Sequence, residues 1–296
     1  MSVYNGQAPG QLPWSGPTSR LLRRVYGPRS PASLFIEEAR NLRLSHNIQG
    51  PPFDPYEYAA ALGIRVEQVD DCIFDGVLRF VNNEFLVQLK RDVSPNRKRF
   101  TLAHEIAHTF FYDLASHSAK FRDESQFDPE EERLCDWAAA ELLMPGAVFA
   151  RDLSSFQRDG DGRITPPVLL KLRRLYKVSL RAVATRVSFV SRAVGCALWK
   201  RQGETVTPEW VTPGSFKPLM LCQTGHSSVE LALGREDVVE KLDRVYTGRG
   251  PTKYRVFKTS SLALESGLVL SVFVLPESCR SLVWARKRLQ RSSRRY

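Results

Sequence analysis

Two histidines stand four residues apart in this 296-residue chain, with a glutamate directly after the first, in the order His104-Glu105-Ile106-Ala107-His108. Residues four apart lie on one face of a helix, so His104 and His108 can bind one metal ion together. Glu105 can reach the open side of that ion and act there as a general base. The pattern also arises by chance in about one chain of this length in a hundred, and the histidines would then be ordinary core residues.

Two acidic residues further along the chain can complete a metal site with the two histidines. A catalytic zinc ion takes three protein ligands and keeps a fourth position for water. Glu132 can be the third ligand, and Asp136, four residues later on the same helical face, can accept the ring N–H of a ligating histidine. Glu130 and Glu131 are rivals for the third position, but Glu131 is followed four residues later by Cys135, a poorer partner for a histidine ring. The spacing therefore favours Glu132.

The donor set narrows the choice of metal without fixing it. Two imidazoles and a carboxylate suit zinc, although manganese(II) or iron(II) could occupy the same ligands. No residue is assigned to stabilising an oxyanion, because Tyr112, one turn beyond the second histidine, and His117, in the following loop, are both expected to be structural. We therefore expect a zinc centre with one catalytic residue, Glu105.

Apolar periodicity and turn residues predict the elements that position these side chains. The sequence predicts helices at 31–44, 55–62, 97–113 and 129–145, and strands at 64–69, 76–81 and 84–89. Pro129 suits the start of a helix, and Pro145 marks its end. The strands are expected to form a small, mostly antiparallel sheet, whose edge beside the cleft could hold an extended substrate.

The protein is expected to have an α+β fold, in which a helical segment and a second domain follow this core. Two helices at 166–176 and 180–190, joined by Lys177-Val178-Ser179, have the appearance of a helix-turn-helix. After residue 195 we expect strands at 195–201, 229–233, 254–258 and 268–275, and a helix at 237–245. The predicted organisation is a flexible leader (1–30), a zinc metallopeptidase domain (31–160), a helix-turn-helix-like segment (161–194), an α+β sensor-like domain (195–285) and a basic tail (286–296).

The composition restricts the function classes. The formal net charge of +11 is compatible with an acidic partner such as nucleic acid. However, we interpret the basic termini as solvated tails and the basic helices at 166–190 as a packing unit, so DNA binding is not favoured. No apolar run reaches the ~18 residues of a membrane helix. The N-terminus lacks the layout of a secretion signal, so we expect a cytoplasmic protein. The five cysteines form no C-x-x-C pair and are expected to be buried apolar residues.

Two stretches resemble the ImmA/IrrE family of metallopeptidases, whose ligand layout is similar to that of the gluzincins. They are Arg99-Phe-Thr-Leu-Ala-His-Glu-Ile-Ala-His-Thr-Phe110 and Glu132-Arg-Leu-Cys-Asp-Trp-Ala-Ala-Ala-Glu-Leu-Leu-Met-Pro145, with weaker similarity at 59–66 and 172–187. The resemblance implies a zinc-dependent endopeptidase that cleaves a helix-turn-helix transcriptional repressor and so derepresses stress-response or mobile-element genes. In the IrrE-like branch the C-terminal part is a GAF-like sensor domain. The alternative is a DNA-binding transcriptional regulator on a metallopeptidase-like fold.

Overall fold

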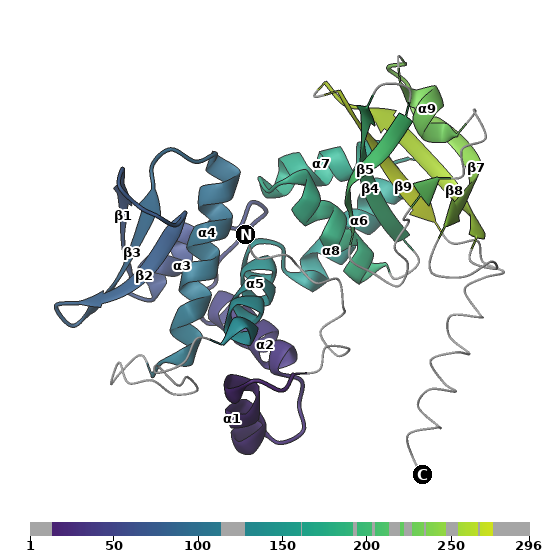
Figure 1. The fold of residues 1–296 in the computed structure, drawn as a ribbon. Helices are drawn as coiled ribbons and strands as arrows, with labels where there is room; N and C mark the ends of the chain where they lie inside the picture. Colours follow the sequence, from purple (N-terminus) through teal and green to yellow (C-terminus); the bar gives the residue numbers. More distant parts are fainter. Residues whose placement is uncertain are drawn as a thin grey trace, which may run out of the picture. The chain divides into compact units, whose positions relative to one another are not determined.

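The chain divides into two compact units, which are described separately (Figure 1). The first unit comprises residues 1–152 and 172–183, and the second comprises 153–171 and 184–296. The computed structural model describes residues 14–113, 128–160, 162–191, 194–202, 205–212, 220–221, 227–233, 235–246, 254–265 and 267–274. Among these residues, no helix combines the length and the apolar character that crossing a membrane requires.

Proline starts most of the helices in the first unit. The helices are α1 (Pro17–Tyr26), α2 (Pro31–Ser45), α3 (Pro55–Ala61), α4 (Pro95–His108) and α5 (Pro129–Leu143), and a 3₁₀ turn, η1 (Thr109–Phe111), follows α4. Proline is favoured at the first helical position because its missing N–H would have no partner there and its φ angle is already helical. The helices predicted at 31–44, 55–62, 97–113 and 129–145 are all present, with small shifts at their ends.

The sheet of the first unit contains β1 (Arg65–Val69), β2 (Gly76–Val81) and β3 (Glu84–Lys90) in the order β1-β3-β2. The pair β2 and β3 is an antiparallel hairpin, and Asn82 and Asn83 take the positive φ angles that a tight hairpin turn needs. The prediction of a mostly antiparallel sheet is wrong for β1, which pairs with β3 in parallel. The reason is that β1 connects to β2 on the far side of β3 rather than turning back beside it.

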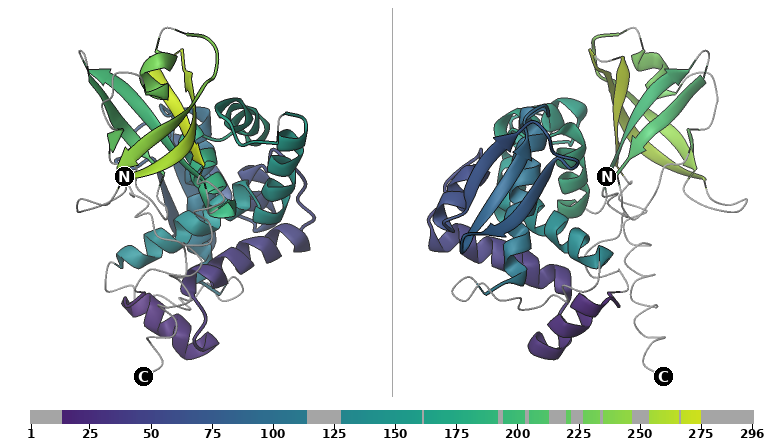
Figure 2. Two further views of the ribbon diagram at one scale, coloured as in Figure 1. Left: turned by 90° about the vertical axis from the view of Figure 1, so that its right-hand side faces the viewer. Right: turned by 60° about the vertical axis from the view of Figure 1, so that its left-hand side comes forward.

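Helix α4 lies between this sheet and α5 (Figures 1 and 2). Its fully buried side chains include Leu102 and Ile106, and two small residues of α5, Ala138 and Ala139, are also fully buried. On the sheet side, a Cβ atom on Gly76 would collide with the side chain of Thr101, so the glycine lets β2 approach α4 closely. The first unit thus surrounds the His-Glu-x-x-His helix with packed elements.

The expectation of a flexible leader over 1–30 is wrong for residues 17–26, which form α1; residues 1–13 lie outside the described residues. Helix α1 is held by hydrogen bonds to the start of α5. The backbone N–H of Thr18 donates to Asp128 at 3.1 Å, and its hydroxyl donates to Glu131 at 2.7 Å. The N–H of Ser15 donates to Glu130 at 2.8 Å. We call this set of bonds the α1–α5 clasp. The sequence alone did not show these polar contacts, which join residues more than a hundred positions apart.

Three further helices follow α5. They are α6 (Gly146–Arg158), which was not predicted, and α7 (Pro166–Tyr176) and α8 (Leu180–Val190), which lie where two helices were predicted. Their likeness to a helix-turn-helix motif stays a prediction. Residues 172–183 group with the first unit rather than beginning a separate segment at 161. Tyr176 stacks on Phe53, packs at a tilt against Phe149 and donates a hydrogen bond to Asp152 at 2.7 Å.

The second unit contains a six-stranded sheet of order β5-β4-β9-β8-β7-β6, in which every neighbouring pair is antiparallel. The strands are β4 (Val194–Gln202), β5 (Thr205–Val211), β6 (Met220–Leu221), β7 (Val239–Tyr246), β8 (Tyr254–Ala263) and β9 (Leu268–Val274). Trp199, Phe257 and Phe273 centre its core, together with Val229 and Ala232 of the short helix α9 (Ser228–Ala232). An α+β fold is confirmed, but a GAF-like identity stays a prediction, and the basic tail at 286–296 lies outside the described residues.

Two secondary-structure predictions for this unit are wrong. The strand predicted at 229–233 is helix α9, because Ser227 accepts a hydrogen bond from the N–H of Glu230 while the Glu230 carboxylate accepts one from the N–H of Ser227. The helix predicted at 237–245 is strand β7, which pairs with β8 from Val239 to Tyr246. Pairing with a long neighbour decided the second case, since local propensity is a weak determinant beside tertiary contacts.

Candidate metal centre

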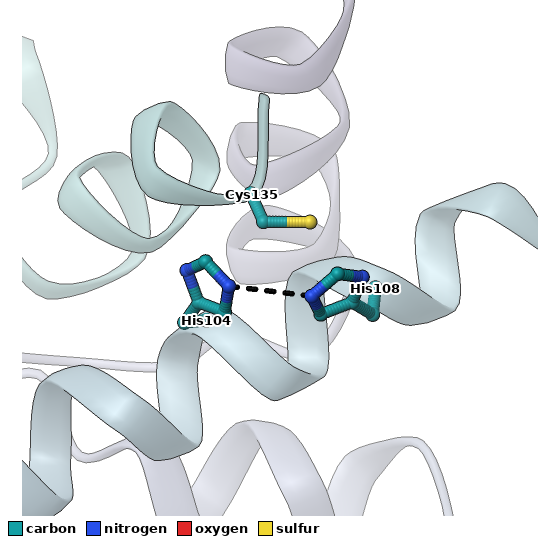
Figure 3. Close-up of side chains that lie close together, drawn as sticks. All are labelled: His104, His108 and Cys135. Atoms are coloured by element: carbon teal, nitrogen blue, oxygen red, sulfur yellow. Dashed lines mark hydrogen bonds between the residues drawn. The ribbon is translucent and has the colours of Figure 1, made fainter. Parts of the chain in front are cut away.

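The last two turns of α4 present two imidazole rings on one face. The side chains of His104 and His108 are each 12% exposed, and their Nε2 atoms lie 3.2 Å apart (Figure 3). Two imidazole nitrogens at this separation can share a proton in an N–H···N hydrogen bond or bind one metal ion together. Donor atoms bound at 2.0–2.1 Å to one tetrahedral ion would lie about 3.3 Å apart. The two rings therefore fit a common ion.

Glu132 of α5 approaches both rings. One carboxylate oxygen lies 3.2 Å from Nε2 of His104, and the other lies 3.5 Å from Nε2 of His108. Each separation is close to the tetrahedral spacing of about 3.3 Å, and the two separations involve different oxygens of the carboxylate. The two nitrogens and the carboxylate are a donor set that zinc accepts, so the residues present fit a metal ion.

Asp136 holds the first ring from behind. Its carboxylate lies 3.0 Å from Nδ1 of His104 and is 3% exposed. A proton on Nδ1 directed at this carboxylate leaves the Nε2 lone pair free for a metal ion. Burial lowers the pKa of His104, but the hydrogen bonds to Asp136 and Glu132 outweigh it and raise the pKa to about 10 in the metal-free chain. The negative charges of these two carboxylates favour the binding of a cation.

Glu105 lies beside the edge strand of the sheet. It is 8% exposed, and one of its carboxylate oxygens accepts a hydrogen bond from the backbone N–H of Leu78 at 2.9 Å. Burial raises the pKa of Glu105, while the neighbouring His104 and the Leu78 N–H partly lower it. A raised pKa brings the carboxylate closer to the working range of a general base near neutral pH. Because Gly76 lets β2 approach α4 closely, the backbone N–H of Leu78 can reach the carboxylate of Glu105.

The rival acids of α5 have other partners. The carboxylates of Glu130 and Glu131 are 5% and 3% exposed as residues, and both accept hydrogen bonds within the α1–α5 clasp. Of the three acids in the first turn of α5, Glu132 is the one whose contacts with both imidazoles are described. Tyr112 packs its ring against Phe85 at 5.5 Å, and His117 lies outside the described residues.

Sequence reasoning missed one side chain of this group. Cys135 is fully buried, and its sulfur and one nitrogen from each of His104 and His108 all lie within 4.8 Å of one another (Figure 3). The signal was its position three residues after Glu132 on the same helical face. It was read as an apolar residue because no second cysteine accompanied it, although a single thiol can join ligands from another helix.

Part of this chain is similar to known proteins. Residues 59–188 match the family model of the IrrE N-terminal-like domain. The radiation response metalloprotease IrrE of Deinococcus deserti is 32% identical over 126 residues, which cover 40% of this chain and 43% of the relative. The protein of the same name from Deinococcus radiodurans is 29% identical over 167 residues, 55% of this chain and 42% of the relative. The aligned regions thus span less than half the length of these two relatives.

One solved structure, a Mycobacterium tuberculosis transcriptional regulator, resembles the fold with a TM-score of 0.52 and 12% sequence identity, over 91% of this chain and 83% of that chain. An identity this low speaks for the fold alone. The family model, in contrast, covers α4 and α5 with all the side chains described above. Residues 59–188 of this chain are therefore similar to the IrrE N-terminal-like domain, in agreement with the resemblance to the ImmA/IrrE family.

Proposed function

We propose that this chain is a zinc-dependent endopeptidase whose metal ligands are His104, His108 and Glu132 and whose general base is Glu105. The observation that carries the proposal is the spacing of the donor atoms, with 3.2 Å between the two Nε2 atoms and 3.2 and 3.5 Å from them to Glu132. The two relatives named as metalloproteases support the reaction class. When bound, the ion would polarise a carbonyl and lower the pKa of a water molecule toward about 7.

The residues of the chain divide the remaining work. Glu105 takes the proton of the water that attacks the peptide carbonyl and returns it to the amine that leaves. Asp136 accepts the N–H of Nδ1 of His104, so Nε2 is the nitrogen that would give up its proton when the ion binds. Leu78 holds the carboxylate of Glu105 through its backbone N–H, so the base is positioned by the edge strand β2. That edge can also bind an extended peptide by strand addition, because β2 pairs only with β3 among the described strands.

As substrate we propose a helix-turn-helix transcriptional repressor, whose cleavage would derepress stress-response genes. The support is the family that residues 59–188 resemble, together with the radiation response in the names of the two relatives. The first candidates to test are helix-turn-helix repressors whose genes lie close to the gene of this protein. The physiological metal is proposed to be zinc, with manganese and iron as alternatives.

The test is incubation of the full chain with such a repressor and Zn²⁺ or Mn²⁺, followed by mass spectrometry of the products. Glu105→Gln keeps the shape of the side chain and removes the base, so we expect cleavage to fall by at least ~100-fold while the bound metal is retained. Retained cleavage by the variant would contradict the role of Glu105. Cleavage of a generic protein but not of the repressor would contradict the substrate alone.

A second candidate function is DNA binding by a transcriptional regulator that has a metallopeptidase-like fold. The similar structure from Mycobacterium tuberculosis is described as a transcriptional regulator, and α7 and α8 carry basic side chains, which favours this candidate. A basic surface supports phosphate contacts without base recognition. A gel shift with promoter and generic DNA of equal length separates the candidates, because a regulator must prefer the promoter at the same salt concentration.

A further inference from the structure

Cys135 lies within the candidate metal centre, and the function proposed above does not use it. Its sulfur is within 4.8 Å of a nitrogen of each imidazole, and its side chain is fully buried beside them (Figure 3). Cysteine sulfur is among the ligands that zinc binds most readily, at about 2.3 Å. We propose that Cys135 binds the metal ion through its sulfur, together with His104, His108 and Glu132. The inference rests on the metal centre of the proposed function.

The geometry of α5 supports a joint role for three of its residues. Glu132, Cys135 and Asp136 occupy positions i, i+3 and i+4, which share one face of a helix. The Glu132 side chain is 38% exposed, whereas Cys135 is fully buried. The carboxylate therefore lies on the solvent side of the imidazole pair and the thiol lies on the interior side. One helix face thus offers two ligands of different chemistry, along with the carboxylate that holds His104.

The charges of the ligands agree with this role. Two neutral imidazoles, one carboxylate and one thiolate balance the two positive charges of a zinc ion, and a buried site favours electrical neutrality. When the metal–sulfur bond forms, the S–H bond breaks and its proton passes to water.

A sulfur ligand has two consequences for the site. Thiolate is a soft ligand that favours zinc and cobalt over manganese, so Cys135 makes this centre selective among the metals that the other three ligands accept. Four protein ligands also leave no position for water, as in structural zinc sites. The sulfur must therefore be displaced before Glu105 can assist a hydrolytic reaction, and Cys135 holds the centre closed at rest.

The experiment is a Co²⁺ titration of the full chain followed by absorption spectroscopy, with Cys135→Ala and Cys135→Ser as test variants. Cys196 is an equally buried free thiol in β4 of the second unit, so Cys196→Ser is the matched control. We expect the wild type and the control to show both the visible bands of tetrahedral cobalt and a near-ultraviolet band from thiolate-to-cobalt charge transfer. Both Cys135 variants should lose the near-ultraviolet band and keep the visible bands. Circular dichroism verifies that they fold, and the alanine variant serves if serine is not tolerated.

Two other outcomes are distinguishable. Visible bands without the near-ultraviolet band in the wild type would overturn the sulfur ligand and leave the metal centre of the proposed function intact. If no bands appear in any protein, the metal centre itself is wrong, and the inference is wrong with it. Competition with a chelator adds a second readout: Cys135→Ala should weaken Zn²⁺ binding at least tenfold and Mn²⁺ binding much less. An equal loss for both metals would contradict a soft sulfur ligand.

Discussion

The two units bury polar groups of different kinds. Among residues whose burial the structure describes, the first unit buries six acidic side chains, and the second buries none. Those six are Glu105, Asp128, Glu130, Glu131, Asp136 and Glu141. Both units bury hydroxyl groups, and those of the second unit include a ladder in which Ser261 contacts Ser228 at 2.9 Å and Ser271 at 2.7 Å. A buried hydroxyl needs one partner, whereas a buried carboxylate is costly unless several donors or a cation neutralise it.

This difference separates the buried acids that stabilise the fold from the buried acids that surround the candidate metal centre. Asp128, Glu130 and Glu131 obtain donors from α1, and Glu141 accepts from the backbone N–H of Gly146 at 3.1 Å. Asp136 is paired with His104 instead, and Glu105 with Leu78 next to that ring. The clasp stabilises the start of α5, and the remaining acids gather around the two imidazoles. The comparison therefore predicts large effects on stability at the clasp, effects on metal affinity at the centre and small effects in the hydroxyl ladder.

The largest effect on stability is expected for Asp128→Ala. One carboxylate oxygen caps α5 by accepting from the N–H of Glu130 at 2.9 Å, and the other accepts from Thr18. Loss of the cap and of the Thr18 contact should lower the free energy of unfolding by about 3 kcal/mol. Asp128→Asn keeps a capping oxygen and should cost about half as much. Urea denaturation measures both, and equal costs for the two variants would contradict the clasp.

The next effect is a loss of metal affinity in Asp136→Asn. The amide keeps the size of the carboxylate but no longer supports a proton on Nδ1 of His104 with a negative charge. Removing such a partner weakens metal binding by about 10- to 100-fold. Glu141→Gln is the control, because Glu141 is an equally buried acid of α5 that contacts Gly146. If the two variants bind Zn²⁺ equally well in chelator competition, the buried acids of α5 do not differ in role.

The smallest effect is expected for Ser261→Ala in the second unit. The substitution leaves the hydroxyls of Ser228 and Ser271 without their shared partner, at a cost of about 1 kcal/mol in unfolding free energy. Replacing all three serines by alanine should be closer to neutral, because no buried hydroxyl is then left alone. Thermal unfolding of the single and triple variants measures the difference. A triple variant that loses three times as much would show that the ladder contributes like the acids.

Some features of the protein were determined by short-range pattern. The four-residue spacing of His104 and His108 and of Glu132 and Asp136 follows from helical geometry, so both pairs could be recognised before any fold was known. The helices that start at proline and the turn at Asn82-Asn83 were also predictable, because each depends on the backbone preferences of one or two residues. The family resemblance of residues 97–146 also agrees with the matched domain at 59–188.

Only the tertiary structure decided the remaining features, because they depend on which elements pack together. Helix α1 forms in a segment that was predicted to be flexible, since its polar groups meet the acids of α5. The residues of α9 were predicted to form a strand, but a capping box makes them a helix. The residues of β7 were predicted to form a helix, but pairing with β8 makes them a strand. Cys135 is one thiol among five in the sequence, and it becomes a candidate ligand only because packing of α5 against α4 brings its sulfur to two imidazoles.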